Sequence, residues 1–427
     1  VSGIPAPADF HDTFQPPELK DELLSAVPDY NVDVAPNPWK KSLTWESCVN
    51  CLEARRKAAA YLLRKFSPDL FIVVFTILDR VQHLFWEDTD PSHPMHPRKK
   101  ESGFAHAIPH TYELLDRAVG ELLSIAGNGV RAFIVSDHGF TPYKRRFNLN
   151  LWLRRNGYLH YRRSLSGAAL NALRGALSRA RITVLVRRLF PMTETRAEVF
   201  RSAAAALLID WKKTTVYATP DMRIRVNLRG REPEGVVSPG AEYARIVDEL
   251  VGKLKDAVIP DTGERVFRDV LKREQVVSSA HAADAPDVFA FTSDPSLLAR
   301  SFHGSARIVE NIAFPEAPGT HDHDGVFIAA GPGIARGVET APRPIHDAAP
   351  TILYSLNAPI PENMDGKPMA EIFDPGFLEA NPPASGPPFE KPAPAAERAA
   401  GKPEEPPLTP DEERELERRL RGLGYID

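Results

Sequence analysis

The sequence predicts an α/β fold in which a central, mostly parallel sheet carries helices on both faces. Three short apolar runs indicate this class: residues 71–78 (FIVVFTIL), 130–135 (VRAFIV) and 326–331 (VFIAAG). Each is rich in β-branched or aromatic residues, as expected for a strand buried on both faces of a parallel sheet. Sequence with helical periodicity lies between the runs, and alternating helices and buried strands are typical of α/β proteins.

The helices that separate these strands have clear boundaries in the sequence. Apolar positions recur at helical spacing from about residue 44 to 65, and Ser67-Pro68-Asp69 ends that helix. A second helix is expected from about His110 to Ile125, where Gly127-Asn128-Gly129 ends it. A third begins near Asp347 and has Pro350 in its first turn, where proline is well tolerated.

Composition divides the chain further. Shorter strand-like pieces, TTVYAT and RIRVNL, and a helix near Tyr243 to Ala257 follow a basic helical stretch at 169–190. We therefore expect an inserted α+β subdomain on the main sheet. A segment rich in proline and alanine then separates the core from a charged helix. The expected parts are core domain 1–163, inserted subdomain 164–309, core domain 310–374, Pro-rich linker 375–409 and C-terminal helix 410–427.

The overall composition excludes several classes of function. The chain has 427 residues, of which 43% are hydrophobic and 26% charged, the balance of a globular protein. Its formal net charge of −4 gives no general basic field, so we expect no nucleic-acid binding. No apolar run approaches the roughly 20 residues needed to cross a bilayer, so we expect no association with a membrane.

Two features bear on the compartment. The only cysteines, Cys48 and Cys51, lie inside a helical sequence rather than at a helix start after a strand, so two buried thiols are expected rather than a redox pair. So few cysteines, with no signal-peptide pattern, favour the cytoplasm. Because the chain opens on Val1 rather than methionine, we expect the true N-terminus to lie upstream.

Polar residues gather where the apolar runs end, and ligand sites of open α/β sheets lie at the carboxyl ends of strands. After the first run, Asp79 and His83 are four residues apart, which places both on one face of a helical turn. Such a pair can bind a divalent cation. The alternative is an aspartate that caps the helix beside a packed histidine.

The second run delivers Ser-Asp-His-Gly at its tip. Asp137 and His138 would be poorly solvated after a buried strand unless they were paired or bound to a metal. Gly139 allows a sharp backbone turn that brings both side chains toward one point. This pair is the strongest single indication of a functional site.

The third segment, PGTHDHDGVFIAAGPG, precedes its strand. His321 is expected to reach the sheet on a loop, and His323 is a competing candidate for the same role. A solvated polar loop is the alternative interpretation. Taken together, the three segments provide five oxygen and nitrogen ligands, a set that suits two borderline divalent ions such as zinc or manganese. Two such metal ions can stabilise both the attacking and the leaving oxygen of a displacement at phosphorus.

These motifs resemble the type I phosphodiesterase / nucleotide pyrophosphatase family of the alkaline phosphatase superfamily. The resemblance rests on LDRVQHLFW, FIVSDHGF and GTHDHDGVFIAAGPG, and it continues through the stretches VNLRGREPEGVV, APDVFAF, APTILYSLNAPIPENMDGKP and LRGLGYID. It implies an alkaline-phosphatase-like α/β sandwich and an enzyme that hydrolyses phosphoric esters. The expected substrates are small molecules with a phosphodiester or nucleotide pyrophosphate bond. It also implies that Asp79, His83 and His321 bind one metal ion, and that Asp137 and His138 bind the other.

The resemblance also reveals a deficit. Family members begin with a strand that ends in a metal-binding aspartate, followed by a Ser or Thr nucleophile at a helix N-terminus. Residues 1–78 contain neither pattern, and VSGIPAPADF resembles the stretch that follows the nucleophile. We therefore expect both groups to lie upstream, and residues 1–427 alone to be inactive. The alternatives are a sulfatase, phosphonate hydrolase or phosphoglycerate mutase of the same superfamily, and a non-catalytic protein that keeps the fold for binding.

Overall fold

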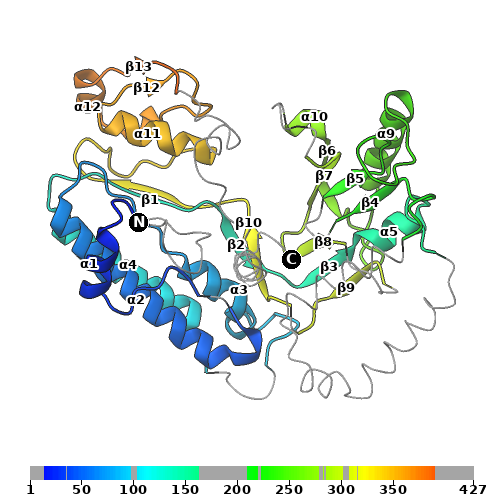
Figure 1. Ribbon diagram of the computed structural model, residues 1–427, viewed down its shortest axis with the longest axis horizontal. Helices are drawn as coiled ribbons and strands as arrows, with labels where there is room; N and C mark the ends of the chain where they lie inside the picture. The colour runs from blue at the N-terminus through cyan, green and yellow to red at the C-terminus, as the bar shows by residue number, and fades with distance from the viewer. Residues whose placement is uncertain are drawn as a thin grey trace.

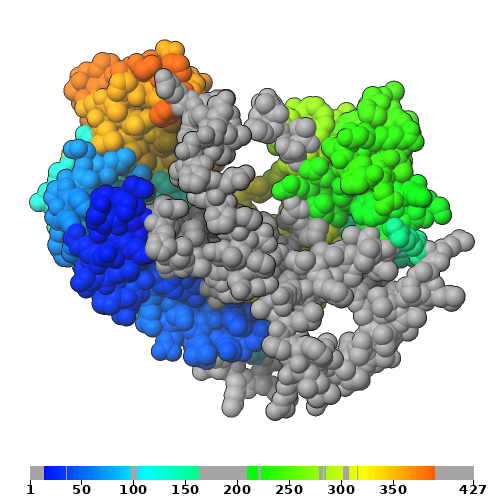
Figure 2. Space-filling model, viewed as in Figure 1, coloured from blue at the N-terminus to red at the C-terminus, as the bar shows by residue number. Residues whose placement is uncertain are grey.

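The computed structural model gives the arrangement of the chain (Figure 1). It describes residues 14–34, 36–97, 103–162, 209–219, 223–277, 282, 285–301, 307–314 and 316–389. Helices α1 to α4 lie together on one side, and the sheet that contains β4 to β7 lies on the other, with β2 and β10 between them. Figure 2 shows the same two parts on opposite sides of one face.

The helical part forms around two long helices. Its helices are α1 Leu19–Ala26, η1 Pro38–Lys40, α2 Lys41–Phe66, α3 Ile77–Thr89 and α4 Ala107–Ala126. The predicted end of α2 is confirmed, because Ser67 caps it in a left-handed conformation at φ 40°. Buried apolar residues of α2, α3 and α4 share one core, in which Leu52, Val81 and Phe85 are fully enclosed. This packing fixes α3, the helix that carries Asp79 and His83.

The strands of the core domain pair in a mixed fashion. β1 Ala132–Val135 runs antiparallel to β11 Phe327–Ala330, and β2 Gly139–Pro142 runs antiparallel to β10 Gly319–Asp322. β3 Arg145–Asn148 lies between β8 Leu297–Arg300, which is parallel to it, and β9 Val309–Asn311, which is antiparallel. The α/β class and two of the three predicted strands are confirmed, but Ile134 of β1 and Ile328 of β11 are 42% and 52% exposed, so their expected burial on both faces is wrong. Most of the described pairs are antiparallel, however, rather than parallel.

The first apolar run does not form the predicted buried strand. Residues 71–76 do not form a strand, and α3 already begins at Ile77. Ile72 and Val74 are 70% and 60% exposed, so the expectation of burial on both faces is wrong. An apolar run can specify a strand only together with the neighbours that accept its backbone hydrogen bonds. Here Arg55 binds the Val74 carbonyl instead, at 2.5 Å.

The second half of the molecule has its own core. A four-stranded sheet in the order β4-β5-β7-β6 packs against α9, with α5 at its edge. The elements are α5 Leu149–Arg155, β4 Val216–Ala218, β5 Ile224–Val226, α9 Ala241–Lys255, β6 Phe267–Lys272, α10 Arg273–Val276 and β7 Val288–Thr292. The predicted strands TTVYAT and RIRVNL and the predicted helix are all present. The basic stretch 169–190 lies outside the described residues.

A small cap completes the described chain beside β1 and β11. It contains η3 Ile345–Asp347, α11 Ala348–Ser355, β12 Ile360–Pro361, η4 Ala370–Ile372, α12 Pro375–Ala380 and β13 Ser385–Gly386. Helix α11 confirms the predicted helix near Asp347. Residues 375–389 were expected to open a linker, but α12 packs here with Phe377 buried, so that boundary is wrong. The expected C-terminal helix lies outside the described residues. Within them, every helix is too short or too polar to cross a membrane.

Candidate metal centre

Helix α3 presents the first two predicted ligands. Asp79 lies in its first turn and His83 one turn later, so the two side chains share a face, as predicted. The distance between Asp79 Oδ1 and His83 Nε2 is 3.5 Å. Trp86, another turn along, stacks on Phe140 of β2, whose ring also lies edge-on to His83 at 4.7 Å. The apolar ring therefore helps to hold the imidazole in place.

The antiparallel pair of β2 and β10 brings His138 and His321 to this helix. His321 lies on β10, opposite Phe140 of β2, so the expectation that it approaches on a loop is wrong. Two glycines permit the close packing. A Cβ at Gly319 would lie 2.3 Å from the Gln82 carbonyl oxygen of α3, and a Cβ at Gly139 would lie 2.0 Å from that of Asp324. Gly139 is thus required for a close approach, rather than for the sharp turn predicted.

Four of the five predicted ligands converge. His321 Nε2 lies 3.1 Å from Asp79 Oδ1 and 3.0 Å from His83 Nε2. His138 Nε2 lies 3.8 Å from Asp79 Oδ1, and the His138 ring stacks on that of His321 with centroids 3.7 Å apart. Asp79, His138 and His321 each offer a ligand atom within 4.8 Å of the others. Residues from three separate segments therefore meet at one point.

The hydrogen bonds of two histidines determine which ring nitrogen faces this point. His83 Nδ1 lies 2.9 Å from the Gly319 carbonyl oxygen, and His138 Nδ1 lies 3.0 Å from that of Gly139. A carbonyl only accepts, so each Nδ1 carries the hydrogen, and Nε2 is the ring nitrogen that faces the cluster and can bind a metal through its lone pair. Metal-binding histidines commonly donate their second nitrogen to a carbonyl in this way.

The resulting donor set fits a divalent cation. Lone pairs of His83 Nε2 and Asp79 Oδ1 both face His321 Nε2, which carries at most one hydrogen. One hydrogen cannot satisfy both acceptors, whereas a divalent ion is bound by three or four nitrogen and oxygen donors of this kind. The residues present therefore match the requirements of at least one metal ion.

The charge state of the site also suits a cation. Burial lowers the pKa of His83 to about 4, so that its imidazole is neutral and able to bind metal at neutral pH. Burial opposes ionisation of Asp79, but the hydrogen bond with His321 and nearby positive charge outweigh it. The pKa of Asp79 consequently lies below its usual value. The site therefore offers an anionic oxygen of Asp79 beside the neutral imidazole of His83.

The remaining candidates lie at the edge of the cluster. The Asp137 side chain is 70% exposed, and its Oδ2 lies 3.6 Å from His138 Nε2. His323 is not part of the cluster, since its ring contacts Phe291 of β7 at 5.4 Å. The assignment of the five residues to two separate ions stays a prediction. Sequence reasoning missed Arg80, whose only signal was its position next to Asp79, and Asp33, which had none.

Comparison with known proteins identifies the family of the chain. The family model of type I phosphodiesterase / nucleotide pyrophosphatase matches residues 6–311. The chain belongs to this family. No curated protein and no solved structure matches it. The type I phosphodiesterase match includes Asp79, His83, Asp137 and His138 but ends before His321, which only the structure joins to them. As a member of this family, the protein is a hydrolase of the phosphodiesterase and pyrophosphatase type with an α/β fold.

Proposed function

We propose that the protein hydrolyses phosphodiester or nucleotide pyrophosphate bonds of small-molecule substrates with two divalent ions, zinc or manganese. The convergence of Asp79, His83, His138 and His321 carries this proposal. These residues come from three segments of a family member, and the single hydrogen that His321 Nε2 can carry does not suffice for both His83 Nε2 and Asp79 Oδ1. A purely structural cluster would instead pair each acceptor with a donor.

The residues of the chain have distinct roles in this proposal. Asp79, His83 and His321 bind one ion, and Asp137 and His138 bind the second, as the family resemblance implies. Bound ions supply Lewis acidity toward the phosphoryl oxygens. The exposed Asp137 carboxylate faces the side from which substrate enters, while Phe140 closes the opposite side against His83 and His321. The family resemblance further implies a Ser or Thr as the attacking group and one more metal-binding aspartate.

The test compares metal binding with phosphodiester turnover. Metal content is measured by mass spectrometry, and turnover with bis-p-nitrophenyl phosphate. Residues 1–427 should bind zinc or manganese, and where the protein turns the diester over, turnover should depend on that metal. His138→Ala and His321→Ala should each lower kcat/KM by about a thousandfold or more, since each removes a ligand worth several kcal/mol. Exposed His346 provides the control, and His346→Ala should leave the rate unchanged.

Two outcomes would contradict the proposal. Activity that survives His138→Ala and His321→Ala would show that the cluster is not the active site. Faster hydrolysis of p-nitrophenyl sulfate than of the phosphodiester would favour a sulfatase of the same superfamily. The cytoplasmic location and the absence of nucleic-acid and membrane partners stay predictions, which fractionation of cells and binding assays can check.

A further inference from the structure

Arg80 is an unusual neighbour for a cation site. It follows Asp79 on α3, is only 1% exposed, and is the largest fully buried side chain of the described residues. A buried guanidinium is costly unless its hydrogen bonds are satisfied, and a positive charge beside a metal ion opposes binding of that ion. A structural reason for its presence must therefore outweigh both costs.

The contacts of Arg80 connect two carboxylates. Its Nε and Nη2 donate to the two oxygens of Asp33, at 3.2 and 2.8 Å, which is the bidentate geometry that fixes a guanidinium plane. Its Nη1 donates to Oδ2 of Asp79. The other oxygen of that carboxylate, Oδ1, is the one that faces His83, His138 and His321. Arg80 therefore occupies one oxygen of the ligand and leaves the other for the metal.

Asp33 is itself held in place from outside the site. Its neighbours Val32 and Val34 are buried, and Arg55 of α2 donates to the Val32 carbonyl. Thr76, at the start of α3, also donates to Asp33 Oδ1 at 3.4 Å. The carboxylate that orients Arg80 is thus anchored to α2 and to the beginning of α3. Its negative charge also offsets that of the guanidinium.

We propose that Asp33 and Arg80 position Asp79 as a ligand that binds through the single oxygen Oδ1, and so set the affinity and coordination number of the metal. This inference rests on the proposed metal site. Arg80 is a positioning residue, because it contacts the ligand and not the ion. Without it, Asp79 can rotate and offer both oxygens or turn away from the histidines.

Arg80→Lys tests the proposal because it keeps the positive charge and removes the guanidinium group that donates to both Asp33 and Asp79. Lysine cannot hold Asp33 at two oxygens and Asp79 at a third. We expect zinc affinity, measured by competition with a chelator, to fall by about 10- to 100-fold, the usual effect of losing a contact that orients a ligand. Asp33→Asn, which keeps the side-chain volume, should weaken zinc binding in the same direction.

Arg231→Lys is the matched control. Arg231 also holds an aspartate at both oxygens, those of Asp287, but it lies in the β4–β7 half of the molecule and does not contact Asp79 or Asp33. This variant should lower thermal stability as Arg80→Lys does, yet leave zinc affinity unchanged. Cobalt(II) provides a second readout, since its visible absorption reports coordination number. The spectrum should change in Arg80→Lys and Asp33→Asn and remain that of the parent in Arg231→Lys.

The outcomes separate this inference from the proposed function. If the parent protein binds neither zinc nor cobalt, the metal site itself is wrong. If the parent binds metal and Arg80→Lys and Asp33→Asn bind it equally well with an unchanged spectrum, Asp33 and Arg80 have no positioning role. If Arg80→Lys does not fold, Asp33→Asn decides by the same two measurements.

Discussion

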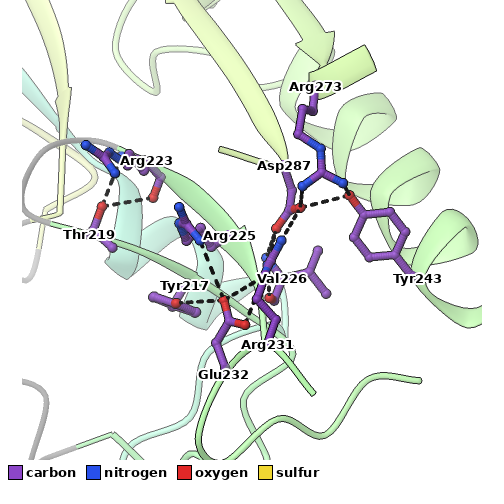
Figure 3. Close-up of polar contacts among 10 residues, drawn as sticks. All are labelled: Tyr217, Thr219, Arg223, Arg225, Val226, Arg231, Glu232, Tyr243, Arg273 and Asp287. Atoms are coloured by element: carbon purple, nitrogen blue, oxygen red, sulfur yellow. Dashed lines mark hydrogen bonds and ion pairs between the residues drawn. The ribbon is translucent and has the colours of Figure 1, made fainter. Parts of the chain in front are cut away.

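Two clusters of buried charged residues, one in each half of the molecule, satisfy their polar groups in opposite ways. In the β4–β7 sheet, Asp287 is 1% exposed and its two oxygens receive hydrogen bonds from every side (Figure 3). Arg231 donates to both oxygens at 2.8 and 2.6 Å, Tyr243 and Arg273 donate at 2.8 and 3.1 Å, and the Val226 amide donates at 2.7 Å. The protein alone completes this cluster.

The candidate metal centre has the reverse balance. His83 Nε2 and Asp79 Oδ1 both turn lone pairs toward His321 Nε2, which has at most one hydrogen for the two acceptors. Because buried polar groups are normally hydrogen-bonded, the shortage of donors is the feature that distinguishes a ligand site from a structural network. Both clusters belong to segments that resemble the family, namely LRGRE and APDVFAF for the first and LDRVQH and SDHGF for the second. Motif similarity alone does not separate the two roles.

The Asp287 cluster and the candidate metal centre should differ most in how much a mutation lowers the free energy of unfolding. Asp287→Ala leaves the half-buried Arg231 and Arg273 without their shared partner, so we expect the free energy of unfolding to fall by about 3 kcal/mol. His138→Ala in the metal-free protein should cost at most about 1 kcal/mol, since the half-buried ring loses only its hydrogen bond to the adjacent Gly139 carbonyl and its ring contacts. Urea unfolding of both variants measures the difference. Equal losses would mean that the histidine cluster is structural.

Acid should act on the Asp287 cluster in a defined range. Burial opposes ionisation of Asp287, but its hydrogen bonds with Arg231 and the Val226 amide outweigh this effect and hold its pKa below the usual 3.8. A lowered folded-state pKa contributes stability above about pH 3.8, and that contribution disappears as the pH falls through the folded-state value. The stability gap between the parent and Asp287→Asn should therefore be constant from pH 7 to 5 and shrink below pH 4. A gap that is the same at pH 3 and pH 7 would contradict the lowered pKa.

The close backbone approach at the metal centre should tolerate no side chain. A Cβ at Gly139 would meet the Asp324 carbonyl oxygen at 2.0 Å, so Gly139→Ala should cost about 1–3 kcal/mol. Gly120, exposed in α4 with open space around it, is the matched control. Gly120→Ala should stabilise the protein by about 0.5–1 kcal/mol, because alanine favours the helix. Thermal melts of the pair decide the point, and a neutral Gly139→Ala would contradict the packing described.

The smallest effect concerns the two thiols. Burial raises the pKa of Cys48 to about 12 and that of Cys51 to about 11, so neither is a thiolate near neutral pH. Alkylation by iodoacetamide at pH 8 should therefore be slow in the folded protein and rapid after unfolding in urea. Rapid labelling of the folded protein would contradict the burial and revive a redox role.

Part of this structure could be predicted from the sequence. Local patterns correctly placed α2, α4, α9 and α11, because capping residues and apolar periodicity act within a few residues. The shared face of Asp79 and His83 followed from their spacing. The pairing of β10 with β2, which places His321 beside His138, joins segments about 180 residues apart, and no local pattern specifies such a register. The same limit explains the exposed run at 71–76 and the unforeseen contact between Asp33 and Arg80.

Zinc binding to the metal-free protein tests the central claim most directly. Residues 1–427, freed of metal by a chelator, are titrated with zinc in a calorimeter, and the double variant of His138→Ala and His321→Ala is titrated in parallel. The ligand set of Asp79, His83, His138 and His321 predicts that the parent binds at least one zinc ion and that the double variant loses this binding. Absence of binding in the parent, or equal binding in both proteins, would contradict it.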